Sequence, residues 1–310
     1  MMLAKRERQP KKPKQTRKRS DRPGPVARLI ARVPPWAAVR SVIILLLAGF
    51  VVSALLHVAR YVQNHERYRI ATVELVDRPP WCPVAVAEQL QRESDRFLGR
   101  SIYDRTVLRE AALAYQGNPW VRKVRYVRKR FPDALVVSLE LRRPGYAVDR
   151  PGKYTVVDRE GYVLLENGRA WADTLTPPLN VWGVKSTAPP PGRRWNDPAL
   201  LGGIEVLEAI ARRPDLLQRA GILGVDVSNF NGARSRKESD IMVRARNDFQ
   251  IAWGRPQSTP RHGEKRDEEK LDMLERCLQV NPQPKGVVLN ARYAGDGGGI
   301  LVKSDRETTR

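Results

Sequence analysis

Cysteine and histidine are scarce in this sequence, whose 310 residues include two cysteines and three histidines. The histidines, at positions 57, 65 and 262, form no His-x-x-x-His pair, and the cysteines form no Cys-x-x-Cys pair. Common metal sites use these spacings. The sequence also lacks the Gly-x-Ser-x-Gly turn of many hydrolases and a phosphate-binding loop. We therefore expect no metal, no cofactor and no catalytic residue.

The two cysteines also lack the spacing of a disulfide framework. Cys82 and Cys277 fall in the two different folded domains that are predicted below. An oxidising compartment would permit a disulfide between them. Because the spacing has no framework pattern, the sequence favours two unpaired thiols.

Two further groupings allow a catalytic and a structural interpretation. Asp158 and Glu160 could form an acid and base pair, but both residue types suit the turn of a strand-turn-strand segment. The glycine-rich residues 295–299 could cradle a phosphate, but no Lys-Ser or Lys-Thr pair follows them. The turn is the favoured interpretation in both cases.

Acidic residues are almost missing from the first 40 positions, which carry 13 Lys and Arg and only Glu7 and Asp21. Residues 5–25 also have many prolines and almost no apolar residues, so we expect residues 1–40 to be a disordered tail. Residues 5–25 have no aromatic side chain that could stack on bases. We therefore expect the tail to contact anionic lipid headgroups rather than a specific nucleic acid.

Formal charge is absent from Val42 to Ala59, a run of 18 residues. As a helix this run would be about 27 Å long, close to the thickness of the hydrocarbon core of a bilayer. Trp36 and Tyr61 flank it as interfacial aromatics do. We predict a transmembrane helix over residues 41–62. A cleaved signal peptide is the alternative, but the basic leader and the apolar core are both too long for one.

The charge asymmetry predicts an orientation for this span. Lys and Arg next to a single span are retained in the cytoplasm, so the tail should be cytoplasmic and residues from Tyr61 onward extracytoplasmic. The predicted protein is thus a single-pass protein of the cytoplasmic membrane.

A first folded domain is predicted over residues 68–143. Residues 68–77 have the β-branched character of a strand, and residues 84–99 form an amphipathic helix that stops at Gly99. A second helix follows, capped by Asp104, with apolar residues at helical spacing up to a stop at Gly117. Two strands complete the order strand, helix, helix, strand, strand.

The basic stretch after the second helix has two faces. Trp120 and Val121 enter the strand and should turn into the core, whereas the Lys and Arg residues up to Arg130 form its solvent face. Residues 131–133 form a turn, and Leu135, Val137 and Leu139 alternate along the returning strand.

A second domain is predicted over residues 144–303, with a short tail at 304–310. Residues 153–164 indicate two strands joined by a turn at Asp158–Gly161. Pro198 begins a helix that Asn196 or Asp197 caps, and residues 268–280 form a second helix on Leu271, Leu274 and Leu278. Strands are predicted over 222–228, 240–246 and 249–254. A hairpin of residues 287–303 closes the domain.

The return strand of this hairpin, Ile300–Val302, is the candidate binding edge. Apolar residues on an edge strand are normally interrupted by charge or proline, and here Lys303 and Asp305 come only afterwards. An extended partner segment can add to such an edge through main-chain hydrogen bonds. The alternative is that this strand only completes the sheet of its own domain.

Four short segments in this order carry a resemblance to a known family: "NPWV" at 118–121, "RKRFPDAL" at 128–135, "LRRPGYA" at 141–147 and "VVDREGYVL" at 156–164. Behind a basic tail and one span, they make the chain similar to the FtsQ/DivIB family of bacterial cell-division proteins. The resemblance implies an α+β protein: a single transmembrane helix, a POTRA domain of order β-α-α-β-β, and a mixed β-sheet domain with flanking helices.

The resemblance also implies partners and binding residues. In the family, the terminal β strands receive the partner FtsB/DivIC, and the matching positions here are Arg292, Tyr293, Ile300, Leu301 and Val302. The sequence departs from the family at Asn290, where an acidic residue is frequent, and in its glycine-rich turn.

Together these features predict a non-enzymatic scaffold of the division septum, with FtsB/DivIC-like and FtsL-like membrane proteins as partners. A POTRA-bearing component of polypeptide transport or secretion is the alternative. That class has repeated POTRA units or a barrel, and neither period occurs in this sequence.

Overall fold

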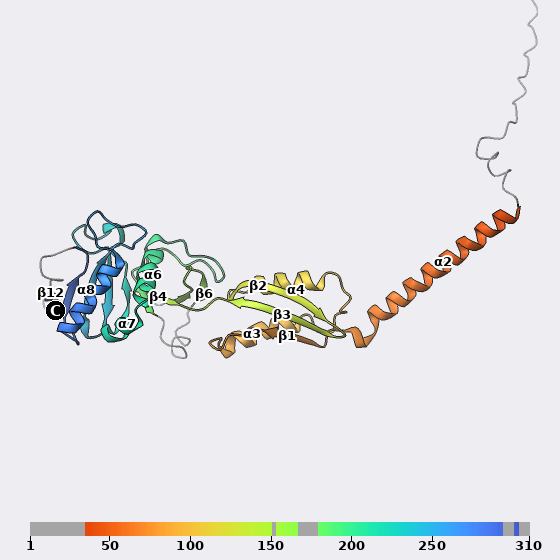
Figure 1. Ribbon diagram of the computed structural model, residues 1–310, viewed down its shortest axis with the longest axis horizontal. Helices are drawn as coiled ribbons and strands as arrows, with labels where there is room; N and C mark the ends of the chain where they lie inside the picture. The colour runs from red at the N-terminus through yellow and green to blue at the C-terminus, as the bar shows by residue number, and fades with distance from the viewer. Residues whose placement is uncertain (1–34, 151–152, 167–178, 294–300, 304–310) are drawn as a thin grey trace, which may run out of the picture. The chain divides into compact units, whose positions relative to one another are not determined.

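The computed structural model of the chain describes residues 35–150, 153–166, 179–293 and 301–303 (Figure 1). The chain divides into two compact units, Met1–Asn64 and His65–Arg310. The predicted boundary between residues 143 and 144 lies inside the second unit and stays a prediction.

In the first unit, one long helix, α2 (Pro35–Asn64), contains the apolar run. Its residues Val39–Gln63 have the length and the apolar composition of a membrane span, with a mean hydropathy of 2.7. The described residues thus contain one helix able to cross a bilayer, over the range where a span was predicted.

The second unit begins with a three-stranded sheet whose strand order is β1-β3-β2. β1 pairs with β3 in parallel, and β2 pairs with β3 antiparallel. The elements follow in the predicted order of strand, helix, helix, strand and strand. Their bounds, with the short helix that precedes them, are η1 (Glu66–Tyr68), β1 (Thr72–Val76), α3 (Val84–Asp95), α4 (Val107–Gln116), β2 (Val121–Arg130) and β3 (Ala134–Leu141).

The predicted core residues of this sheet are buried. Trp120 and Val121 have exposed fractions of 3% and 6%, and Leu135, Val137 and Leu139 are equally enclosed. On β2, Arg122, Lys123, Arg125, Arg128 and Arg130 are exposed, as the two-faced pattern predicts.

Of the two predictions about the ends of α4, the one for its start was wrong and the one for its end is confirmed. Asp104 does not cap α4, whose N-cap is Thr106; its carboxylate instead accepts the N–H and the hydroxyl of Thr106. Gly117 does end α4, but with the φ of −73° that any residue can adopt. The helix stops because Pro119 follows, not because glycine permits a left-handed turn.

A nine-stranded mixed sheet forms the rest of the second unit, in the order β12-β11-β10-β9-β8-β7-β4-β5-β6. Its parallel pairs are β4 with β7, β7 with β8, and β10 with β11. The bounds are β4 (Tyr146–Arg150), β5 (Lys153–Val157), β6 (Val163–Glu166), β7 (Leu179–Trp182), β8 (Ile222–Asp226), β9 (Ile241–Ala245), β10 (Gln250–Gly254), β11 (Val287–Asn290) and β12 (Leu301–Lys303).

Three helices cover one face of this sheet (Figure 1): α6 (Pro198–Ala211), α7 (Pro214–Ala220) and α8 (Asp267–Val280). Asp197 is the N-cap of α6, accepting the N–H groups of Ala199 and Leu200 as predicted. Leu271, Leu274 and Leu278 turn the buried face of α8 into the core. The short helix η2 (Phe230–Gly232) lies between β8 and β9, and η3 (Arg246–Asp248) lies between β9 and β10.

The turn at Asp158–Gly161 has the structural role that the sequence favoured. One carboxylate oxygen of Asp158 accepts the N–H groups of Glu160 and Tyr162, at 2.9 and 2.8 Å. Gly161 has a φ of +80°, which favours glycine. The other Asp158 oxygen accepts Arg142 Nη1 at 2.7 Å. Both carboxylate oxygens of Asp158 are therefore used in structural hydrogen bonds.

The three-stranded and nine-stranded sheets share one apolar cluster. Trp120 and the core of the small sheet pack together with Val156 of β5 and Leu164 of β6. Arg142, at the exit from β3, joins this cluster to the nine-stranded sheet through Asp158, and its guanidinium stacks 3.6 Å from the ring of Tyr162. Trp120 is therefore a core residue of both sheets, which the sequence assigned to the first alone.

We predict that Trp120→Ala costs about 3 to 5 kcal/mol of unfolding free energy, as truncating a buried aromatic does. Arg125→Ala is the control on the same strand: its guanidinium is 3.8 Å from Glu140 and mostly exposed, so its loss should be near neutral. Chemical unfolding of the full chain in detergent measures both. Equal costs would refute the assignment of the two faces.

Candidate partner-binding site

The C-terminal strand β12 is at one edge of the nine-stranded sheet, as the candidate binding edge requires. It pairs antiparallel with β11, with Leu301 opposite Leu289 and Val302 opposite Val288. On its other side, no strand among the described residues pairs with it. Leu301 and Val302, two of the predicted binding residues, thus lie on an edge strand, while Ile300 lies outside the described residues.

β11 is held firmly on the side away from β12. It runs parallel to β10, with Leu289 opposite Ile251 and Asn290 opposite Ala252. The N–H of Ala291 extends this pairing by donating to the carbonyl of Ala252 at 3.1 Å. Leu289 and Ala291 are buried in the core, so the β11 side of the edge is fixed by both hydrogen bonds and packing.

Arg292 is a structural residue as well as a predicted binding residue. Its Nε and its N–H donate to Oδ1 of Asn290, at 3.1 and 3.3 Å, and Nη1 donates to the carbonyl of Lys237 at 3.3 Å. Its own carbonyl accepts the N–H of Lys265 at 2.8 Å. Asn290 therefore orients Arg292 with a neutral amide.

Tyr293 is the exposed member of the set, with 41% of its surface accessible. The guanidinium of Arg292 lies 5.4 Å from the centre of its ring. Tyr293 therefore offers an aromatic surface directly after β11, in a position that a partner could contact.

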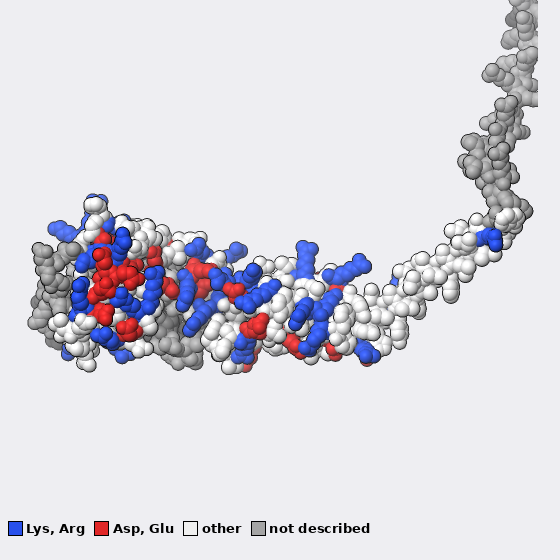
Figure 2. All heavy atoms as spheres, in the orientation of Figure 1, with Lys and Arg blue, Asp and Glu red and all other residues white. Residues whose placement is uncertain are grey.

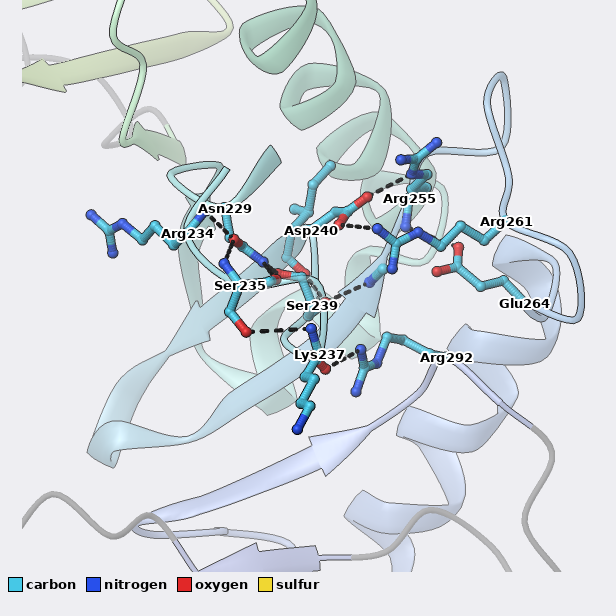
Figure 3. Close-up of polar contacts among 12 residues, drawn as sticks. Asn229, Arg234, Ser235, Lys237, Ser239, Asp240, Arg255, Arg261, Glu264 and Arg292 are labelled. Carbon is cyan, nitrogen blue, oxygen red and sulfur yellow. Dashed lines mark hydrogen bonds and ion pairs between the residues drawn. The ribbon is translucent and has the colours of Figure 1, made fainter. Parts of the chain in front are cut away.

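The loop between β8 and β9 reaches Arg292, and Asn229 organises this loop (Figure 3). The Asn229 carboxamide oxygen accepts the N–H groups of Arg234 and Ser235, both at 2.8 Å. Its amide nitrogen donates to the carbonyls of Ser235 and Ser239. Because Asn229 is buried and satisfied, the loop that carries Lys237 has a defined shape.

A buried carboxylate anchors the far end of the same loop (Figure 3). Asp240 is 2% exposed, and its two oxygens accept Arg255 Nε at 2.6 Å and Arg261 Nη2 at 3.1 Å. Next to it, the hydroxyl of Ser239 donates to the carbonyl of Ile241 and accepts the N–H of Gly254. The β8–β9 loop and the segment after β10 are thereby joined.

Gly254 allows this close approach. It has a φ of +90°, and a Cβ there would lie 2.7 Å from Oε1 of Glu264. Oε2 of Glu264 accepts the N–H of Arg255 at 3.0 Å. A side chain at position 254 would displace Glu264 from the loop that leads to Lys265 and Arg292.

α8 is attached to this region by a buried lysine. The Nζ of Lys270 donates to the carbonyl of Arg255 at 3.2 Å and lies 3.8 Å from Oδ1 of Asp267, which also accepts Trp253 Nε1 at 3.2 Å. Burial lowers the pKa of Lys270 and raises that of Asp267, and their mutual attraction only partly opposes this. The pair is a packed structural contact beneath β10.

These contacts support the residues next to the edge of the described sheet. The sequence identified the edge, but not Asn229, Ser239 or Asp240 behind it. Asp240 was assigned to the start of a strand; a signal was available in the Asn, Gly and Ser residues at 228–240, which are typical of side-chain-stabilised loops. Within the described residues, no group of His, Cys, Asp or Glu is arranged to hold a metal ion.

We predict that Asp240→Ala costs about 2 to 3 kcal/mol, because it leaves two arginines without their buried acceptor. Asp272→Ala is the matched control, since it also loses an arginine partner, Arg213, but at an exposed site. Its cost should be below about 1 kcal/mol. Unfolding of the full chain in detergent, followed by circular dichroism, compares the two. An equal loss would mean that Asp240 does not anchor the loop.

Comparison with known proteins found no match: no model of a protein family matches the chain, and no curated protein matches it.

Proposed function

We propose that the chain is a single-pass membrane scaffold whose β12 edge receives an extended segment of a partner protein by strand addition. The observation that carries the proposal is the position of β12, paired with β11 on one side and with no described strand on the other. The function is that of positioning proteins, without bond chemistry.

Strand addition is favoured by an edge strand whose outer main-chain groups are unpaired and whose conformation is already ordered. The main-chain N–H and C=O groups on the outer side of β12 can bond a partner's backbone. The β10–β11 pairing and the contacts of Arg292 keep the β11 side in place. A partner then need not order the edge, which reduces the entropic cost of binding.

The resemblance to the FtsQ/DivIB family suggests the biological setting. By this proposal the three-stranded sheet with α3 and α4 is a POTRA domain, the nine-stranded sheet is the family's β domain, and the partners are FtsB/DivIC-like and FtsL-like proteins of the division septum. The strand order β1-β3-β2 and the edge position of β12 support it.

Membrane anchoring completes the proposed mechanism. With α2 in the cytoplasmic membrane, the basic tail contacts anionic headgroups on the cytoplasmic side, and both sheets are extracytoplasmic. Confinement of the scaffold and its partners to one membrane raises their effective concentration, so that a short β-edge contact suffices.

Proline substitution at two adjacent positions tests the edge. Along a strand, successive N–H groups point to opposite sides, so one of Leu301 and Val302 donates toward β11 and the other outward. We predict that Leu301→Pro and Val302→Pro differ: the inward one destabilises the edge hairpin, whereas the outward one leaves the fold intact and abolishes partner capture. Pull-down of the FtsB/DivIC-like partner by the full chain, with hydrogen exchange over β11, separates these effects.

Leu301→Ala is the control for the proline pair, because it keeps every main-chain group. It should weaken capture less than the outward proline does. Undiminished capture by both proline variants would sink the proposal.

The orientation is tested separately by labelling cysteines with a membrane-impermeant reagent. Lys153→Cys, at an exposed position of β5, should react in intact cells whose outer membrane has been permeabilised. Lys11→Cys, in the tail, should react only after lysis, and the parent chain gives the background from Cys82 and Cys277. The opposite pattern would reverse the topology.

A further inference from the structure

A chain of aromatic rings lies at one end of the three-stranded sheet. The ring centres of His65 and Tyr68 are 6.1 Å apart, those of Tyr68 and Tyr103 are 5.3 Å apart, and those of Tyr103 and Phe131 are 5.6 Å apart. We name these four residues the aromatic cluster. Phe131, in the turn between β2 and β3, has 58% of its surface accessible.

The backbone beneath the aromatic cluster is rigid, because three separate segments are tied together there. The N–H of Ile102 donates to the carbonyl of Tyr68 at 2.7 Å, and the N–H of Ala71 donates to the carbonyl of Asp133 at 2.8 Å. Lys129 Nζ, from the end of β2, donates to the carbonyl of Asp104 at 2.8 Å. The rings are therefore held together before any ligand binds.

Arginines lie next to two of the rings in sequence: Arg67 and Arg69 flank Tyr68, and Arg105 follows Tyr103 by two residues. Arg67, Arg69 and Arg105 are exposed, and among the described residues no carboxylate forms an ion pair with any of the three. The nearby acids are Glu66 and Asp133, while Asp104 is paired with Arg100. Figure 2 shows Asp and Glu gathered over α8, whereas Lys and Arg prevail over the three-stranded sheet and its helices. Residues 65–143 contain 16 Lys and Arg against 10 Asp and Glu.

The place of the aromatic cluster in the chain indicates its ligand. Its first ring, His65, comes two residues after Gln63, the end of the candidate span. Aromatic rings with polar tips, accompanied by Arg and Lys, are the side chains that membrane-water interfaces favour. An exposed phenylalanine next to such rings adds an apolar group that can enter the boundary between headgroups and acyl chains.

We infer that the aromatic cluster docks the three-stranded sheet onto the surface of the membrane that holds α2. Phe131 enters the boundary between headgroups and acyl chains, the phenol groups of Tyr68 and Tyr103 stay at headgroup level, and Arg67, Arg69 and Arg105 contact lipid phosphates. The contact fixes the folded unit to the bilayer near the span. The inference rests on α2 lying in a membrane and is independent of the β12 edge.

Photocrosslinking from position 131 tests this docking in the intact protein. The full chain, with benzoylphenylalanine replacing Phe131, is reconstituted into nanodiscs of phosphatidylethanolamine and phosphatidylglycerol. Mass spectrometry should detect lipid adducts about tenfold more abundant than those from the same group replacing Tyr126. Tyr126 is the matched control, because it is an exposed aromatic on β2, at 41%, outside the aromatic cluster.

A charge-reversal variant tests the headgroup contacts. Arg67→Glu with Arg105→Glu should reduce the lipid adducts at position 131 several-fold in the nanodiscs that contain phosphatidylglycerol, and less in nanodiscs of phosphatidylcholine. Both arginines are exposed, so circular dichroism should be unchanged. Equal lipid labelling from positions 131 and 126, or adducts at 131 to a second copy of the chain instead of lipid, would overturn the inference. Partner capture by β12 is unaffected in either outcome.

Discussion

The buried contact between Arg142 and Asp158 is the constraint on which the second unit depends. Arg142 follows β3, and Asp158 begins the turn between β5 and β6, so this buried ion pair joins the two sheets, and the exposed pair of Arg122 with Glu160 adds to it. The same carboxylate shapes the turn through two backbone N–H groups, and the same guanidinium stacks on Tyr162. Since both charges are almost fully enclosed, removal of either would leave the other without its main ion-pair partner and would loosen the turn and the junction together.

The apolar cluster around Trp120 supports this junction. It combines the core of the small sheet with residues of β5 and β6, the strands farthest from β12 in the nine-stranded sheet. The two ends of the nine-stranded sheet thus have different surroundings. At one end the sheet packs against its neighbour through Val156 and Leu164. At the other, no described strand pairs with the outer side of β12, and the loop contacts of Asn229 and Asp240 stabilise the residues beside it.

Much of this architecture could be predicted from local patterns. The apolar spacing of Leu271, Leu274 and Leu278 predicted α8, and Asp197 with Pro198 predicted the start of α6. β4, β7 and α7 were missed. β7 is short and pairs in parallel with both of its neighbours, β4 and β8, so its pairing depends on residues far away in sequence. The burial of Lys270 could not be predicted from the sequence either, because it depends on Trp253 of β10 and Asp267 of α8 coming together in the folded chain.

The parallel pairing of β10 with β11 has a consequence for the order of assembly. A parallel neighbour cannot form by a tight turn, so the chain must first cross over through α8 before β11 can align with β10. Among the described strands, β12 in turn pairs with β11. Such non-local pairings form late, after the loop-closure entropy has been overcome. The open edge therefore comes into existence only once the sheet behind it is complete, and an incompletely folded chain has no such edge to present.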